Sequence, residues 1–195
     1  QRLDSELVKK LAQHYADNPH IVVWHVNNEY GGNCYCGNCQ NAFRDWLRNK
    51  YKTLGALNKA WNMNVWSHTI YDWDEIVVPN ELGDAWGPES SEAIVAGLSI
   101  DYLRFQSESL QNLFKMEKAV IKKYDPETPV TTNFHSLPNK MIDYQKWAKD
   151  QDIISYDSYP TYDAPAYKPA FLYDLMRSLK HQPFMLMESA PSQVN

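Results

Sequence analysis

Two glutamates stand at the ends of short runs of mainly apolar residues. Glu29 follows residues 21–26 after a pair of asparagines, and Glu188 follows residues 183–187. A short apolar run closed by polar residues is typical of a β-strand that is buried on both faces. In barrels of parallel strands, the carboxyl ends of the strands carry the chemistry. Two carboxylates that meet there can flank a glycosidic bond, one as general acid and the other as nucleophile.

A structural explanation of the two glutamates also stays open. Glu29 would then be a carboxylate on a surface loop, and Glu188 would cap the turn that follows its strand. Acid catalysis at neutral pH further requires that one carboxyl group has a raised pKa while its partner stays ionised. The spacing of the two residues alone does not separate these interpretations.

A second group of reactive side chains lies just after Glu29. Cys34, Cys36 and Cys39 fall within six residues, and they are the only cysteines of the sequence. Three cysteines this close together do not suit a disulfide framework, because their number is odd and the loops would be too short. Zinc prefers four tetrahedral ligands, and a tight loop containing Gly37 can supply three thiolates. The spacing therefore favours a metal site over three free thiols.

The composition excludes some classes of function. The chain has 195 residues and a formal net charge of −5, whereas a nucleic-acid-binding protein would favour a basic stripe. No apolar run approaches the ~20 residues of a membrane helix. We expect the N-terminus to be a cut, so the absence of a targeting signal means little. The 7 Trp and 13 Tyr fit either an ordinary core or sugar stacking, and composition alone favours the core.

Periodicity and turn signals predict an alternation of strands and helices. The predicted strands are residues 21–26, 129–134, 152–156 and 183–187. The predicted helices are residues 3–17, 38–51, 53–61, 91–124, 141–149 and 171–180. Residues 62–90 have no regular pattern, and a connection of this length in a compact domain is usually functional or disordered.

Short buried strands that alternate with helices predict βα units and a parallel sheet. In an open doubly wound sheet Glu29 and Glu188 would lie far apart, whereas in a closed barrel they would face each other across the mouth. A whole (β/α)8 barrel takes ~250 residues, and only four strands are predicted here. The expected fold class is therefore α/β, a partial TIM barrel, with residues 1–195 as one segment that is truncated at both ends.

Several motifs, taken in order, resemble one family. They are WHVNNEY at residues 24–30, the C-x-C-x-x-C of residues 34–39, the set Trp46, Leu47 and Tyr51, LGALNKAW at 54–61, DYLRF at 101–105, TTNF at 131–134, YDSYP at 156–160 and MESAPSQVN at 187–195. The sequence resembles the family-42 glycoside hydrolases, bacterial β-galactosidases with (β/α)8 barrels and a retaining mechanism. These motifs cover nearly the whole chain, so the resemblance is strong.

The resemblance implies roles for the two glutamates. Glu29 would be the acid/base at the end of the fourth strand, and Glu188 the nucleophile at the end of the seventh. The chain would then hold about strands four to seven with their helices. It would belong to a retaining glycoside hydrolase that cleaves terminal β-D-galactosides by double displacement, without a catalytic cofactor.

The resemblance also implies a galactose subsite. Asn28 would bond the sugar 2-hydroxyl, an interaction that strengthens in the transition state. Tyr159, Asn133 and Asp157 would line the subsite. Strand-end capping or turn formation is the alternative for these three residues, and Asp157 in particular favours turns. His135 matches no motif of the family and is interpreted as a loop histidine.

The cysteines and the partners follow from the same resemblance. Members of the family with this loop take a fourth thiolate from upstream, and no such cysteine exists in this chain, so the structural zinc site of Cys34, Cys36 and Cys39 would be incomplete. The expected partner is a galactoside or oligosaccharide substrate, with no nucleic acid and no membrane. The full-length protein is expected to be a cytoplasmic homo-oligomer, a trimer by family resemblance.

Two other functions stay open. The same fold and mechanism could serve another sugar, such as an α-L-arabinopyranoside, whose ring differs from galactose mainly at the exocyclic carbon. Alternatively, the chain could be a catalytically silent fragment or a carbohydrate-binding domain. We expect the isolated chain to hydrolyse little or nothing, because strands one to three and eight are missing from it.

Overall fold

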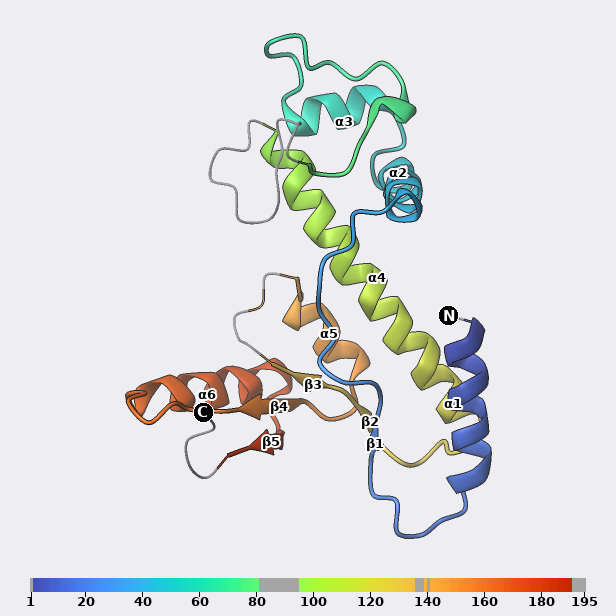
Figure 1. Cartoon of the computed structure of the whole chain (residues 1–195), viewed down its shortest axis with the longest axis vertical. Coiled ribbons are helices and arrows are strands. Elements are labelled where there is room, and N and C mark those ends of the chain that lie inside the picture. The colour runs from blue at the N-terminus through green and yellow to red at the C-terminus, as the bar shows by residue number, and fades with distance from the viewer. Residues whose placement is uncertain (1, 81–94, 136–138, 140, 191–195) are drawn as a thin grey trace. The chain divides into compact units, whose positions relative to one another are not determined.

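The computed structural model describes residues 2–80, 95–135, 139 and 141–190 of the chain (Figure 1). Helices and strands alternate over most of this length. In chain order they are α1 (Arg2–Tyr15), β1 (Trp24–His25), α2 (Gly37–Tyr51), α3 (Leu54–Trp61), the 3-10 helix η1 (Trp73–Glu75), α4 (Ala96–Lys122), β2 (Val130–Thr131), β3 (Asn133–Phe134), α5 (Tyr144–Asp150), β4 (Ser155–Ser158), α6 (Tyr167–Lys180) and β5 (Met185–Ser189). Among the described residues, no helix combines the length and the apolar character needed to cross a membrane.

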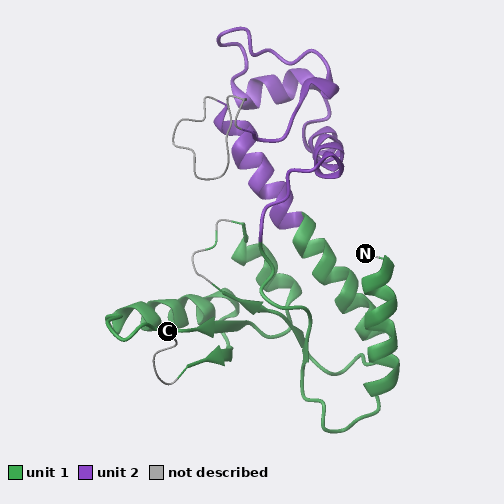
Figure 2. Cartoon of the chain, viewed as in Figure 1, with its two compact units in different colours: residues 1–31, 109–195 green, residues 32–108 purple. Residues whose placement is uncertain are grey.

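The chain forms two compact units (Figure 2). Unit 1 comprises Gln1–Gly31 and Ser109–Asn195, and unit 2 comprises Gly32–Glu108. Helix α4 contributes its first half to unit 2 and its second half to unit 1. The five strands found among the described residues all belong to unit 1. Glu29 and Glu188 lie in this unit, and the three cysteines lie in unit 2.

Every strand pair in unit 1 is parallel, as the alternation of strands and helices predicts. Strand β1 pairs with β2, and β4 lies between β3 and β5 in a three-stranded sheet. Helix α6 lies beside β4 (Figure 1). The strands therefore point their carboxyl ends the same way, which is the arrangement that gathers strand-end residues at one edge.

The strand boundaries differ from the predicted ones. The single strand expected at residues 129–134 is divided into β2 and β3, because the chain changes partner at Thr132 from β1 to β4. Strand β4 begins at Ser155 rather than at residue 152. Asp152 is bonded to Val130 in two ways: its carboxylate accepts the Val130 N–H at 2.8 Å, and its own N–H donates to the Val130 carbonyl at 3.0 Å. Strand β5 extends to Ser189, so Glu188 is part of the strand rather than the residue after it.

Two of the helices also differ from expectation. Helix α6 begins at Tyr167 rather than at residue 171, because Pro169 lies in the first helical turn, where its missing N–H needs no partner. In α1 the helical spacing of Leu3, Leu7 and Leu11 puts them on one face and predicts that this face is buried, yet these side chains are 67%, 60% and 44% exposed. The fully buried side chain of α1 is Ala12, so this helix packs through a different face.

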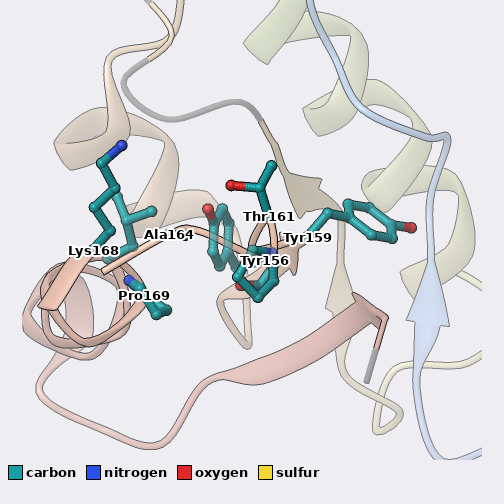
Figure 3. Close-up of a pocket in the computed structure, with 9 residues that line it drawn as sticks. Tyr156, Tyr159, Thr161, Ala164, Lys168 and Pro169 are labelled. Carbon is teal, nitrogen blue, oxygen red and sulfur yellow. The ribbon is translucent and has the colours of Figure 1, made fainter. Parts of the chain in front are cut away.

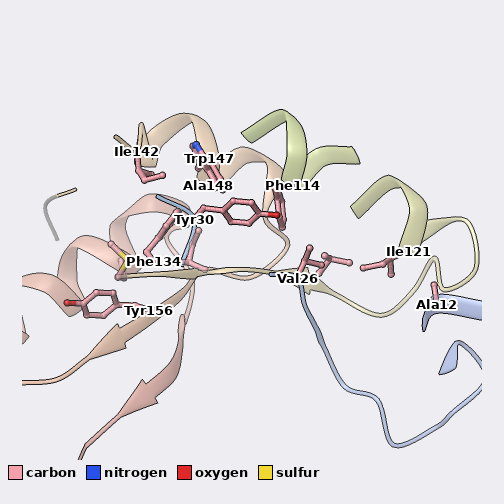
Figure 4. Close-up of a cluster of buried hydrophobic side chains, with 13 residues drawn as sticks. Ala12, Val26, Tyr30, Phe114, Ile121, Phe134, Ile142, Trp147, Ala148 and Tyr156 are labelled. Carbon is pink, nitrogen blue, oxygen red and sulfur yellow. The ribbon is translucent and has the colours of Figure 1, made fainter. Parts of the chain in front are cut away.

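Trp147 of α5 belongs to the core of unit 1 and lies close to Phe114 and Tyr30 (Figure 4). Its side chain is completely buried, and its ring lies 5.2 Å from that of Tyr30, 6.1 Å from that of Phe114 and 6.3 Å from that of Phe134. Tyr30 directly follows Glu29, and Phe134 directly follows Asn133. The same aromatic cluster thus anchors the two segments that carry candidate site residues.

The core of unit 2 joins α2, α3 and the first half of α4. Phe43 and Leu47 of α2, one turn apart, are fully buried, as their helical spacing predicts. They belong to a cluster with Leu57 and Trp61 of α3 and Phe105 of α4. The loop that follows α2 and α3 was expected to be irregular at residues 62–90, and it contains η1; residues 81–90 lie outside the described part of the chain.

Replacement of Trp147 by Ala should destabilise the chain by about 3–5 kcal/mol, because it removes a completely buried indole and leaves a cavity. The free energy of unfolding from urea denaturation measures this loss. Phe171→Ala is the matched control, since Phe171 is 66% exposed and its removal should cost less than about 0.5 kcal/mol. Equal losses in the two variants would contradict the placement of Trp147 in the core.

Candidate functional site

Three carboxylates converge at the carboxyl ends of the strands in unit 1. Glu29, Asp157 and Glu188 each offer a carboxylate oxygen within 4.8 Å of the other two. The register of the parallel strands β4 and β5 shifts by one residue between Tyr156 and Asp157, and this irregularity sets Asp157 beside Glu188. Glu29 lies in the segment after β1. Glu29 and Glu188 remain partly exposed, whereas Asp157 is only 4% exposed.

The separation of Glu29 and Glu188 suits one kind of glycosidic chemistry. Pairs of carboxyl groups about 5–5.5 Å apart carry out retaining hydrolysis, whereas inverting pairs stand about 6.5–9.5 Å apart to admit a water molecule. Oxygen atoms within 4.8 Å of each other belong to the closer class. A nucleophile and a general acid could therefore act on the same anomeric carbon.

Asn133 connects the carboxylates of Asp157 and Glu188 to the segment after β1 that carries Glu29. Its Oδ1 accepts hydrogen bonds from the Glu29 backbone N–H at 2.9 Å and, at 3.0 Å, from His25 Nε2. Its Nδ2 donates to Asn28 Oδ1 at 3.0 Å and to Asp157 Oδ2 at 2.5 Å, and lies 3.5 Å from Glu188 Oε1. Only 1% of Asn133 is exposed, so it lies beneath the carboxylates rather than at the surface.

Tyr159 holds the other side of Glu188. Its hydroxyl group donates a hydrogen bond to Glu188 Oε2, and the residue is 49% exposed. The hydrogen bond to Glu188, more than burial, raises the pKa of Tyr159 to about 12. Tyr159 therefore keeps its proton at neutral pH and remains a donor to the carboxylate.

Asp157 differs electrostatically from an ordinary aspartate. Burial and then the charge of Glu188 raise its pKa from 3.8 to about 6, and the hydrogen bond from Asn133 opposes this rise. Its Oδ1 is buried without a hydrogen-bond partner among the described residues. Asp157 is thus a carboxyl group that takes up a proton well above the pH at which a free aspartate does.

The backbone around Glu29 has an unusual conformation. Asn27 has a φ of 57° and Glu29 a φ of 49°, which places both in the left-handed region. For residues other than glycine such conformations cost about 1–3 kcal/mol and persist where surrounding contacts impose them. They turn the chain sharply after β1 and leave the Asn28 side chain exposed. Strain of this kind is common at functional sites.

The two glutamates and the four residues expected to bind the sugar all lie in unit 1, but they differ in exposure. Asn28 and Tyr159 offer surface to a ligand, while Asn133 and Asp157 offer almost none. One further residue joins the group: His135 Nδ1 lies 3.9 Å from Glu29 Oε2. The sequence could have pointed to His135, because it directly follows a strand and polar residues follow each of the predicted strands.

A separate hollow lies between β4 and α6 (Figure 3). It has a volume of about 220 Å³, and Tyr156, Ser158, Lys168 and Leu172 contribute to its walls. Tyr159 borders it too, but its ring extends away from Lys168 and Pro169. None of the three carboxylates lines this hollow. We therefore locate the candidate site at the carboxylates, whose side chains can transfer protons or act as nucleophiles.

The three cysteines form a compact cluster in unit 2. Cys36 Sγ lies 3.5 Å from Cys34 Sγ and 3.7 Å from Cys39 Sγ. Tetrahedral zinc with Zn–S bonds of about 2.3 Å sets its sulfur ligands about 3.8 Å apart, so the separations fit such an ion. A hydrogen bond from the Cys39 backbone N–H lowers the pKa of Cys36 to about 7, whereas burial raises the pKa of Cys39 to about 12. Cys36 therefore loses its proton to give a metal-binding thiolate more readily than Cys39 does.

Helix α4 anchors the cysteine loop. Gln106 accepts the Cys34 N–H at 3.1 Å and donates to the Cys34 carbonyl at 3.0 Å, and Tyr102 donates to the same carbonyl oxygen. Among the described residues the cluster offers three ligands. The chemistry and spacing of these sulfur atoms could therefore hold a metal ion.

The chain matches known proteins over its whole length. The family model of glycoside hydrolase family 42, described as "Beta-galactosidase", matches residues 2–195. The β-galactosidase LacZ of Lactobacillus acidophilus is 87% identical over 195 residues, which are 100% of this chain and 29% of that protein. This chain thus spans less than a third of the length of that relative.

Solved structures agree with the sequence matches. The crystal structure of β-galactosidase from Bacillus circulans sp. alkalophilus superposes with a TM-score of 0.91 at 52% identity, over 97% of this chain and 28% of that one. The family-42 β-galactosidase Gan42B of G. stearothermophilus, solved as a catalytic mutant, gives a TM-score of 0.86 at 39% identity over 96% of this chain and 28% of that one. These matches confirm the expected fold class, a partial TIM barrel.

The buried Asp157 should make the chain less stable as the pH rises. Because its pKa is raised from 3.8 to about 6 in the folded state, the folded chain binds more protons than the unfolded chain between these values, and stability falls through that window. Asp157→Asn removes this loss and should stabilise the chain at pH 8 by on the order of 2 kcal/mol.

Thermal denaturation of both chains from pH 4 to pH 8 measures the effect. Asp163→Asn removes the same charge from an exposed position and serves as the control, which should follow the parent. If Asp157→Asn showed the same pH dependence as the parent, the raised pKa of Asp157 would be disproved.

Proposed function

The chain belongs to the glycoside hydrolase family 42 β-galactosidases, and on that premise we propose that it forms part of a retaining enzyme for terminal β-D-galactosides. The observation that carries the proposal is the meeting of the Glu29 and Glu188 carboxylates within 4.8 Å of each other. Since the chain spans 29% of its Lactobacillus acidophilus relative, the activity belongs to a longer protein that contains this segment.

In the first step of the proposed reaction, Glu188 is the nucleophile. A carboxylate oxygen of Glu188 attacks the anomeric carbon while the bond to the departing oxygen breaks. Glu29 donates its proton to that oxygen, so the alcohol leaves neutral. The sugar remains bound to Glu188 as a covalent ester, and Glu29 is left ionised.

In the second step, Glu29 acts as the base. It takes a proton from a water molecule as the water oxygen attacks the anomeric carbon, and the bond to Glu188 breaks. Galactose is released with its original β configuration, Glu29 regains its proton and Glu188 regains its charge. Two inversions at one carbon give overall retention.

Neighbouring residues support these roles. The hydrogen bond from Tyr159 to Oε2 of Glu188 fixes the orientation of the carboxylate that attacks. Asn28 is exposed beside Glu29 and would bond the sugar 2-hydroxyl. Asn133 and Asp157 are buried and have almost no surface for direct contact with a sugar. They would support the subsite residues from beneath.

Two alternatives remain distinct from this proposal. An α-L-arabinopyranoside would present the same ring without the exocyclic carbon, and none of the residues above selects against it. The 195-residue chain in isolation is a different case: it covers 28% of the Bacillus circulans chain, and we expect it to be catalytically silent. The cytoplasmic location and the trimer implied by the family resemblance stay predictions.

The cysteine cluster is proposed to hold a structural zinc ion. Cys34, Cys36 and Cys39 would provide three thiolates, and the fourth position would be filled from outside the described residues or by water. When bound, zinc would cross-link the loop that precedes α2 and leave the catalytic steps to Glu29 and Glu188. The cluster belongs to unit 2, whereas the candidate active-site residues belong to unit 1.

Replacement of the two glutamates tests the proposed mechanism. The host is the Lactobacillus acidophilus relative with its matched segment replaced by residues 1–195 of this chain. Glu188→Gln should lower the turnover of 4-nitrophenyl β-galactoside by about 10⁴-fold or more, the scale on which a lost nucleophile acts. Glu29→Gln should lower it by about 10²–10⁴-fold, since general acid catalysis is lost.

Glu127→Gln provides the matched control, because Glu127 is exposed and distant in sequence from both glutamates. It should turn over the substrate at the parental rate. Appreciable turnover by Glu188→Gln would remove the nucleophile assignment. A comparison of galactoside with α-L-arabinopyranoside in the same host separates the two substrate classes.

Zinc added to the reduced chain should raise its thermal midpoint, because ion binding to the folded loop stabilises it. Cys36→Ser should abolish this rise, as the central sulfur of the cluster is lost. Magnesium is the control, since it prefers oxygen ligands and should have no effect. Elemental analysis that finds no zinc in the full-length host would refute the structural-zinc proposal.

A further inference from the structure

The side chain of Asn133 makes polar contacts with five other residues of the candidate site or its surroundings: His25, Asn28, Glu29, Asp157 and Glu188. Asn133 is the first residue of β3, level with Ser155 of β4. Side chains two residues apart on a strand point to the same face, so Asp157 lies one step further along the face that Asn133 shares with Ser155. Asp157 in turn lies beside Glu188 of β5. The side chains of Asn133, Asp157 and Glu188 therefore form one row across the three neighbouring strands β3, β4 and β5.

The carboxamide of Asn133 is saturated. An amide offers two acceptor positions on oxygen and two N–H donors on nitrogen. The oxygen accepts from the Glu29 N–H and from His25 Nε2, and the nitrogen donates to Asn28 Oδ1 and Asp157 Oδ2, with Glu188 Oε1 a third and more distant acceptor. With 1% of the residue exposed, no position is left for a sugar hydroxyl.

The partners also fix which way the amide points. The Glu29 backbone N–H can only donate, so Oδ1 must face it. Nδ2 must face the carboxylate of Asp157, which accepts at 2.5 Å. A rotation of the carboxamide by half a turn would set oxygen against carboxylate and N–H against N–H. The orientation is therefore determined by the groups around it.

The bond to Glu29 acts on a strained peptide. Glu29 has a φ of 49°, and such a conformation persists only where contacts impose it. The Asn133 oxygen receives the N–H of this residue, and the Asn133 nitrogen holds the side chain of the residue before it. Both contacts span more than 100 residues of sequence, so they fix the segment after β1 against the sheet.

We propose that Asn133 is a positioning residue that acts through Glu29 and Asn28, holding the acid/base and the sugar-binding amide where they meet the bond that is cleaved. This inference rests on the assignment of Glu29 as acid/base. It replaces direct sugar contact as the role of Asn133. A displacement of about 1 Å at a reacting group can cost about 10²-fold in rate, which sets the size of the expected effect.

The test compares two leaving groups in the full-length host. 4-Nitrophenol is the weaker acid of the two phenols, so its departure is accelerated when the enzyme's acid protonates it, whereas 2,4-dinitrophenol is a much stronger acid and leaves with little help. The value of kcat/KM reports the step in which the sugar is transferred to the enzyme. A residue that acts through the acid therefore affects kcat/KM for the first substrate more than for the second.

Asn133→Ala should lower kcat/KM by about 10²-fold for the 4-nitrophenyl substrate and by about 10-fold or less for the 2,4-dinitrophenyl substrate. Glu29→Gln, measured alongside, should show the same selective loss. Thr131→Val is the structural control, because Thr131 is equally buried two residues earlier and bonds Ile153 O and Ser155 Oγ rather than the carboxylates. Thr131→Val should either leave kcat/KM unchanged or lower it by the same factor for the two substrates.

Equal losses for both substrates in Asn133→Ala, or losses no larger than those of Thr131→Val, would overturn the inference. If Asn133→Ala does not fold, Asn133→Ser decides by the same ratio, since its small hydroxyl group adds no charge beside Asp157 but cannot bond both Glu29 and Asn28 as the carboxamide does. Failure of Glu29→Gln to lose activity would instead overturn the proposed function, so the two failures are distinguishable.

Discussion

Repulsion among three carboxylates within 4.8 Å of one another is the constraint that governs the site in unit 1. Charges this close destabilise one another unless protons or donors compensate them. Tyr159 donates to Glu188, Asn133 donates to Asp157, and Asp157 takes up a proton with a pKa of about 6. Each neighbouring group thus reduces the same repulsion, and the two partly exposed carboxylates remain close enough to act on one anomeric carbon.

The fold supplies this arrangement through register and packing. The pairing of Asp157 with Glu188 results from a one-residue register shift after Tyr156 in the parallel pair β4 and β5. Two contacts fix the segment that carries Glu29. Asn133 accepts the backbone N–H of Glu29, and the next residue, Tyr30, packs against Trp147 in the aromatic cluster. Trp147 contacts both Tyr30 and Phe134, so the core lies directly behind the two segments that bring the site together.

Much of this could be predicted from the sequence, for identifiable reasons. Helices α2 and α3 follow the spacing of Phe43, Leu47, Leu57 and Trp61, all of which are buried. The parallel strands follow from short apolar runs separated by helices. The two glutamates were found because each comes at the end of such a run, and the cysteines because their spacing suits a metal.

The remainder depends on contacts that no local pattern contains. The division of β2 from β3 at Thr132 results from a change of pairing partner, and the early start of α6 depends on Pro169 in its first turn. The stripe of leucines on α1 predicted a helix correctly but not which face would be buried. The burial of Asn133 and its bonds to residues more than 100 positions away required the folded chain.

A trapped intermediate tests the central claim that Glu188 is the nucleophile of a retaining site. A 2-deoxy-2-fluorogalactoside with a good leaving group reacts in the first step and slows the second, so the sugar accumulates on the enzyme. Digestion of the labelled full-length host and mass spectrometry should find the sugar on the peptide that contains Glu188, as an ester of that side chain. Labelling of Glu29, Asp157 or another residue, or inactivation without any covalent sugar, would contradict the account.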